Sequence, residues 1–116
     1  MRVTSEFWVG ALLRRAQAGG AFVCVLHKGA KEAGAIFVVI NNLAGDATLL
    51  GPAPQMVYDE TVENTRYFEP LLNGVPEAEV SEKIKRERSF DPDIWVIEIE
   101  DRQERSFIEH VIDPNA

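Results

Sequence analysis

The hydrophobic and polar positions along the chain predict a sheet of mostly antiparallel strands. Residues 21–27 (AFVCVLH), 35–42 (AIFVVINN) and 47–50 are short runs rich in β-branched and aromatic residues. The polar connection 28–34 is bounded by glycines and favours a hairpin between the first two runs, so the three runs predict an antiparallel meander. Residues 35–40 are all apolar, which is typical of a central strand covered on both faces.

A further strand is predicted at residues 94–100 (IWVIEIE). Alternation places Trp95 and the two isoleucines that follow it at alternate positions on the core face. The same alternation places Glu98 and Glu100 on the other face, side by side.

The sequence pattern does not decide the conformation of two parts of the chain, residues 55–75 and 102–112. In the first part, residues 55–58 and 66–69 are interpreted as short edge strands around a polar bend. In the second, residues 105–112 have helical spacing, but a hairpin strand after a tight turn is slightly favoured. The sheet is therefore expected to contain about four to six strands.

Two helices complete the predicted α+β fold. Residues 5–18 form an N-terminal helix, with Ser5 as a suitable N-cap and Thr4 as the alternative. Its apolar residues cover more than one stripe, so we expect it to pack on one face of the sheet. The helix at residues 77–88 has a narrow apolar stripe and should be more exposed.

Length and composition indicate one soluble domain over residues 1–116. The chain is 46% hydrophobic and 27% charged, close to globular averages. No signal peptide is visible, and the longest apolar run is far below the roughly 20 residues of a membrane span. The single cysteine, Cys24, cannot form an internal disulfide. These features predict a cytoplasmic protein that does not bind a membrane.

Charge is distributed unevenly along the chain, whose net charge is −7. The first 58 residues contain five Lys or Arg and three Asp or Glu. The last 58 residues contain seven Lys or Arg and sixteen Asp or Glu. A phosphate backbone repels an acidic surface, so no nucleic-acid partner is expected. The acidic C-terminal half is interpreted mainly as a solvated surface, and functionally as a docking face for a basic protein partner. The sequence is also compatible with a homodimer.

Glu98, Glu100 and Asp101 form the best carboxylate cluster, and His110 is the candidate fourth ligand of a divalent metal. A solvated face with arginine counter-ions is the favoured interpretation of the same residues. No metalloprotease, hydrolase, dinucleotide-binding or thiol-redox motif is present, so no catalytic residue and no cofactor is predicted.

Arg14, Arg15, His27 and Lys28 form the main basic group outside the second helix. If the end of the first helix lies near the end of the first strand, these side chains could bind an anion. Compensation of the helix dipole together with an ordinary hairpin lysine is the favoured interpretation.

Two segments look like chemical motifs but lack the residues or the geometry that each motif requires. Gly29 and Gly34 have the glycine spacing of a phosphate-binding loop, but alanine and isoleucine follow where lysine and serine or threonine are required. Cys24 and His27 lie three apart on a strand and should point to opposite faces. The apolar neighbours of Cys24 should raise the pKa of its thiol, as expected of a buried, inert cysteine.

Several segments together resemble a family of short bacterial proteins, the domain-of-unknown-function family 1491. They are Phe7-Trp8-Val9, residues 12–15, Gly20-Ala21-Phe22, Gly51-Pro52-Ala53-Pro54, Phe90-Asp91-Pro92-Asp93 and residues 95–102 (WVIEIEDR). The resemblance spans nearly the whole chain and implies a free-standing bacterial cytosolic protein. It implies no reaction, cofactor or catalytic residue.

The sequence therefore favours a small non-catalytic binding or accessory module. The alternative is a divalent-metal-dependent hydrolase or nuclease-like enzyme that uses Glu98, Glu100 and Asp101. A binder of small anionic molecules is the third hypothesis, with Arg14, Arg15 and Lys28 as contacts.

Overall fold

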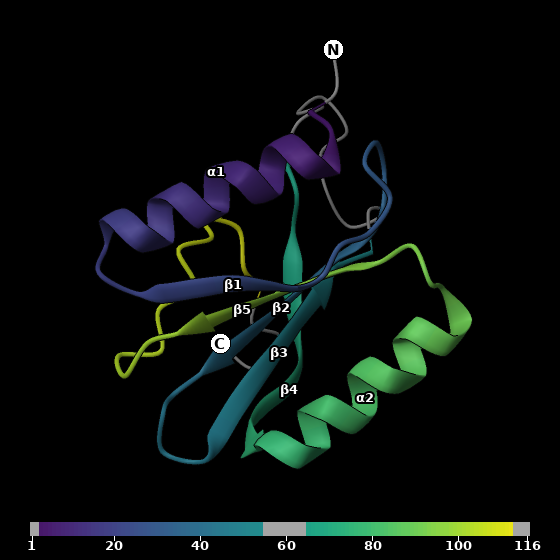
Figure 1. Ribbon diagram of the computed structural model, residues 1–116. Coiled ribbons are helices and arrows are strands. Elements are labelled where there is room, and N and C mark those ends of the chain that lie inside the picture. The colour runs from purple at the N-terminus through teal and green to yellow at the C-terminus, as the bar shows by residue number, and fades with distance from the viewer. Residues whose placement is uncertain (1–2, 55–64, 113–116) are drawn as a thin grey trace.

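A computed structural model of the protein describes residues 3–54 and 65–112, which form a five-stranded sheet with a helix on each side (Figure 1). In chain order the elements are α1 (Ser5–Ala18), β1 (Phe22–His27), β2 (Ile36–Asn41), β3 (Asp46–Pro52), β4 (Phe68–Pro76), α2 (Glu77–Phe90) and β5 (Trp95–Glu100). The strand order is β1-β5-β2-β3-β4, and β2 and β5 form its one parallel pair. The predicted α+β class, mostly antiparallel sheet and two helices are confirmed.

The predicted hairpin between the first two strands is wrong, because β5 lies between β1 and β2. The connection 28–34 spans this inserted strand instead of closing a tight turn. Its Ala30 N–H donates to the carbonyl oxygen of Asp93 (2.8 Å), and Trp95 N–H donates to that of Ala35 (2.7 Å). Only the β2–β3 part of the meander forms. β5 can take this place beside the central strand β2 because α2 carries the chain back across the sheet before β5 begins.

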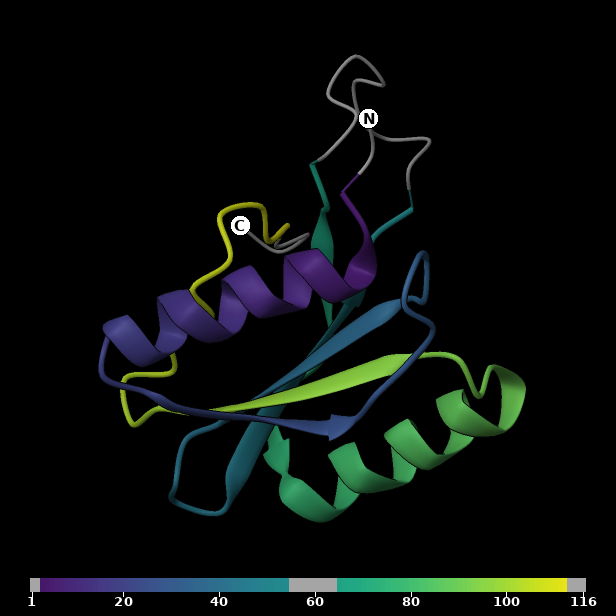
Figure 2. The same cartoon turned by 45° about the horizontal axis from the view of Figure 1, so that its top comes forward.

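The two helices cover opposite faces of the sheet (Figure 2). α1 packs over β1, whereas α2 packs mainly over β3 and β4. Every residue of β2 is buried, as expected of a central strand. The α1-side core is Val9, Leu12, Ala16, Ala21, Val23, Ile36, Val38, Ile40, Leu50, Phe68, Trp95, Ile97 and Ile99. The α2-side core is Phe37, Val39, Ala47, Leu49, Val80, Ile94 and Val96.

The start of α1 is fixed on the connection 28–34. Thr4, the alternative in the sequence prediction, is the N-cap, and its hydroxyl accepts from Phe7 N–H at 3.1 Å. Ser5 is instead fully buried, and its hydroxyl donates to the carbonyl oxygen of Gly34 at 2.6 Å. The N–H groups of Ser5 and Glu6 donate to carbonyl oxygens of the same connection. The free N–H groups at this helix end are therefore used within the fold.

The remaining differences concern the two parts of the chain whose conformation the sequence left open. β4 is longer than the predicted strand at 66–69, because Pro70 and Gly74 are tolerated on an edge strand. The strand favoured at 105–112 does not form. This segment is irregular and pairs with β4 only through a bridge between Phe68 and Val111. The predictions for residues 55–58 and for the bend that follows them lie outside the described residues. No helix in the described part of the chain is long and apolar enough to span a membrane.

Candidate functional site

The carboxylates of the predicted cluster do not lie together at the end of β5. Glu98 and Glu100 are half-buried on the α2 side of the strand. Asp101 is 8% exposed and binds Arg105, whose Nε and Nη2 donate to the two carboxylate oxygens at 2.7 and 3.1 Å. Arg105 also donates to the carbonyl oxygen of Gly19 at 3.1 Å, so the pair joins the end of β5 to the end of α1.

His110 lies on the α1 side of the sheet, away from Glu98 and Glu100. Its ring packs against that of Tyr67, with centroids 5.1 Å apart. Within residues 3–54 and 65–112, no three His, Cys, Asp or Glu side chains lie close enough together to hold a metal ion. The four predicted ligands therefore do not converge.

The Asp101–Arg105 pair gives a pH-dependent contribution to stability. The hydrogen bonds from Arg105 lower the pKa of Asp101 to about 2. An unfolded aspartate titrates near 3.9, so the pair stabilises the fold above about pH 4, and this stabilisation is lost as the pH falls towards 2. We expect Asp101→Asn to be less stable than the wild type at neutral pH in urea unfolding, with a difference that shrinks between pH 4 and 2. The exposed Glu109→Gln should match the wild type throughout. A constant Asp101→Asn difference down to pH 2 would contradict this role.

The four predicted anion-binding cations form two separate groups. Arg14 and Arg15 lie in the C-terminal half of α1, and β1 then runs back along the helix, so its end lies beside the helix start. There the Nζ of Lys28 is 4.0 Å from the carboxylate of Glu6. His27 ends β1 and is half-buried. The register shifts between Val25 and His27, so His27 lies opposite Val96 on the same side of the sheet as Cys24, and the predicted opposite orientation is wrong.

Arg15 and His110, predicted for different sites, line the same cavity on the α1 side together with Trp8. Its volume is about 250 Å³. Arg15 Nε donates to the carbonyl oxygen of Phe107 at 3.2 Å, and His110 Nε2 lies 3.7 Å from the Glu109 carboxylate. The Arg15 guanidinium therefore has a hydrogen-bond partner within the fold.

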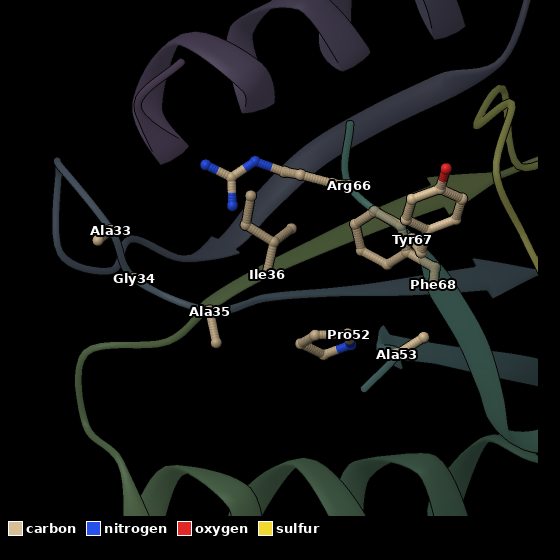
Figure 3. A pocket seen from close by; sticks show the side chains of 9 residues that line it. All are labelled: Ala33, Gly34, Ala35, Ile36, Pro52, Ala53, Arg66, Tyr67 and Phe68. Carbon is tan, nitrogen blue, oxygen red and sulfur yellow. The ribbon is translucent and has the colours of Figure 1, made fainter. Parts of the chain in front are cut away.

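A smaller cavity of about 130 Å³ lies where β2 begins and β3 ends (Figure 3). Its described lining is Ala33, Gly34, Ala35, Ile36, Pro52, Ala53, Arg66, Tyr67 and Phe68. Arg66 contributes its cationic group, which donates to the carbonyl oxygen of Val3 at 2.9 Å. These described lining residues include no carboxylate, imidazole or thiol, so they supply no acid–base pair.

β1 is an edge strand whose α2 side is poorly covered. Phe22 and Leu26 are 65% and 52% exposed. Phe22 pairs with Glu100 and Cys24 pairs with Glu98, so these side chains share one side of the sheet. We call Phe22, Cys24, Leu26, Glu98 and Glu100 the open face. The other edge strand, β4, differs because Phe68 exchanges backbone hydrogen bonds with the segment that follows β5.

A groove separates the open face from α2. Leu26 and Ile84 line both parts of it, a cavity of about 260 Å³ towards the end of β1 and one of about 50 Å³ towards Glu98. His27, Lys85 and Arg88 line the larger cavity, and we call them the basic end. The groove thus has an apolar middle with cationic side chains at one end.

The opposite end of the groove is acidic. The amide of Asn41 donates to Glu77 Oε1, and Asn41 also partly favours the charged form of Glu98. Burial, together with the negative charges of Glu100 and Glu77, raises the pKa of Glu98. Burial and the charges of Glu98 and Glu100 likewise raise the pKa of the Cys24 thiol, as the sequence predicts, although Cys24 is only half-buried. In the described part of the chain, no Lys or Arg forms an ion pair with these carboxylates.

Sequence reasoning missed Lys85 and Arg88 as groove residues. Their position in the last turns of a predicted helix suggested only compensation of the helix dipole. Their spacing of three residues does place them on one side of α2, next to Ile84 and Ser81. That side could not be related to β1 before the strand order was known.

The chain is similar in sequence and in fold to proteins of one family. The sequence profile of the protein of unknown function family DUF1491 matches residues 3–109. The solution structure of protein Atu0922 from A. tumefaciens is 44% identical, covers 100% of both chains and has a TM-score of 0.83. The crystal structure of a DUF1491 family protein from Caulobacter crescentus is 36% identical, covers 95% of this chain and 99% of its own, and has a TM-score of 0.80. No curated protein sequence matches the chain. The chain therefore belongs to the DUF1491 family.

Proposed function

We propose that the protein is a non-catalytic interaction module that binds, along β1, an extended segment of a partner protein that carries a cationic residue. The observation that carries the proposal is the open face itself. An edge strand presents exposed apolar side chains there, next to carboxylates that lack a cationic partner within the described fold.

The edge position of β1 supports an extended partner. An edge strand has backbone N–H and C=O groups that face away from the sheet and can pair with an added strand. The added strand would bury Phe22 and Leu26, which the protein itself leaves largely exposed. α1 packs over β1 and buries Val23 on its own side, where Val25 is less exposed (38%) than Phe22 and Leu26, so the α2 side offers the larger apolar surface for binding.

The charges of the open face support a cationic partner. The negative charges of Glu98 and Glu100 repel one another. Burial and this repulsion both disfavour the charged form of Glu98 and so raise its pKa. A lysine or arginine of the partner would relieve the repulsion. The net charge of −7 would also speed the approach of a cationic segment.

The metal-dependent enzyme has no comparable support, because its proposed ligands lie on different sides of the sheet. We also infer that the protein works in the bacterial cytoplasm. Its single half-buried cysteine and acidic composition support that location.

A peptide titration tests the proposal. The probe is the capped peptide Thr-Lys-Val-Ile-Val-Lys-Thr, added up to about 1 mM, a concentration suited to weak complexes. We expect amide chemical-shift changes in two-dimensional NMR to concentrate on β1 and β5. Affinity should fall as the pH is lowered from 7 to 4, because protonated carboxylates no longer attract lysine.

Two variants provide the matched comparison. Phe22→Ser should weaken binding several-fold, whereas Phe7→Ser should leave it unchanged, because Phe7 is equally exposed (63%) but lies on α1. Absence of shift changes, or equal weakening by both variants, would overturn the proposal.

A further inference from the structure

We infer that the docked segment is bipolar, with a cationic residue beside Glu98 and Glu100, an apolar residue over Leu26 and an acidic residue at the basic end. This inference rests on the proposed function and specifies the chemistry of the partner. The observation behind it is that the two ends of one groove carry opposite charge.

The basic end supplies the anion contacts. Lys85 and Arg88 are exposed side chains of α2, and neither forms an ion pair in the described part of the chain. His27 beside them has its Nε2 3.1 Å from the carbonyl oxygen of Pro92. Glu82 is the one carboxylate among the residues that line this cavity, so the lining keeps a net positive charge. An acidic group of the partner would have two flexible cations within reach.

The spacing of the two ends fits one extended chain. β1 brings Cys24 opposite Glu98 and His27 opposite Val96, and the register shifts between Val25 and His27, so that both Leu26 and His27 line the groove. An extended chain advances about 13 Å over four residues, and its side chains at alternate positions point the same way. A cationic residue and an acidic residue four positions apart, with an apolar residue midway, would therefore meet all three parts of the groove.

The basic end also distinguishes this partner from a uniformly cationic one. A second lysine at that end would lie against Lys85 and Arg88, and like charges repel at this range. A uniformly acidic segment would meet the same difficulty at Glu98. The bipolar pattern avoids both conflicts, so the groove selects for charge pattern as well as for extended shape.

Three capped peptides of one length test the charge pattern. The bipolar peptide is Thr-Lys-Val-Ile-Val-Glu-Thr, and the comparisons replace its charged pair by two lysines or by two glutamates. In about 0.15 M salt, where charges beyond about 8 Å are screened, we expect the bipolar peptide to bind about two- to fivefold more tightly than the dilysine peptide. The diglutamate peptide should bind most weakly.

Variants of α2 assign this preference to the basic end. The double change Lys85→Gln/Arg88→Gln should remove the advantage of the bipolar peptide while the dilysine peptide still binds. Arg86→Gln is the matched control, because Arg86 is an exposed cation of α2 that does not line the groove.

The outcomes separate the two proposals. If none of the peptides binds, the proposed function fails. If peptides bind but the dilysine peptide equals or exceeds the bipolar one, only the bipolar inference is overturned. The bipolar inference also fails if Arg86→Gln abolishes the preference as fully as the double variant does.

Discussion

Phe68→Ala is expected to lower the free energy of unfolding by about 3–5 kcal/mol, the range for removing a buried aromatic ring. Phe68 is 2% exposed and belongs to the α1-side core. Its ring stacks on that of Trp8, with centroids 5.1 Å apart and planes inclined by 28°. The substitution would remove the contact through which the start of β4 is held against α1, and the remaining backbone bonds to the segment after β5 could not fill the space.

Phe90→Ala is the matched control, because Phe90 is 85% exposed at the end of α2. It should change stability by less than about 0.5 kcal/mol. Urea unfolding followed by tryptophan fluorescence and circular dichroism measures both variants. A loss below about 1 kcal/mol for Phe68→Ala would show that this part of the core is not packed as described.

Gly34→Ala is expected to cost about 3 kcal/mol, because an added Cβ would overlap backbone atoms. The carbonyl oxygen of Asp93 lies closest, and the N and O atoms of Ala30 are both 2.9 Å from the Cβ position. Backbone atoms cannot rotate away as a long side chain can. The connection that crosses β5 would have to shift, together with the hydrogen bond between Ser5 and Gly34.

Gly10→Ala is expected to change the free energy of unfolding in the opposite direction, by stabilising the protein. Gly10 lies in the middle of α1, and the nearest atom to its added Cβ is Arg14 Nη1 at an ordinary 3.6 Å. Alanine should stabilise the helix there by up to about 1 kcal/mol. If both glycine variants changed stability in the same direction, the close packing of the connection against β5 would be contradicted.

Local sequence patterns were sufficient to identify most elements of the fold. The continuous apolar run of β2 and the alternation in β5 predicted their places in the core, and both helices have clear ends. The strand order was not predictable, because a polar connection with two glycines fits a hairpin as well as a crossing. Gly29 and Gly34 are required by close contact with the backbone of Asp93, and their spacing only resembles that of a phosphate loop.

The candidate site was predictable only in part. Alternation in β5 did place Glu98 and Glu100 together, and the charge asymmetry pointed to the same half of the chain. The exposure of Phe22 and Leu26 was not visible in a run of apolar residues that fits a buried strand equally well. It follows from the edge position of β1, which is decided by residues more than sixty positions later in the chain.

A partner segment that pairs with β1 as an added strand must use specific backbone N–H groups, so methylation of those groups in the peptide is the decisive test of strand addition. In a strand ladder only alternate N–H groups of the added strand face β1. Two versions of the dilysine peptide, N-methylated on one or the other alternate set of amides, keep identical side chains. We expect one version to lose binding and the other to keep it. Equal affinities for the two versions would contradict strand addition.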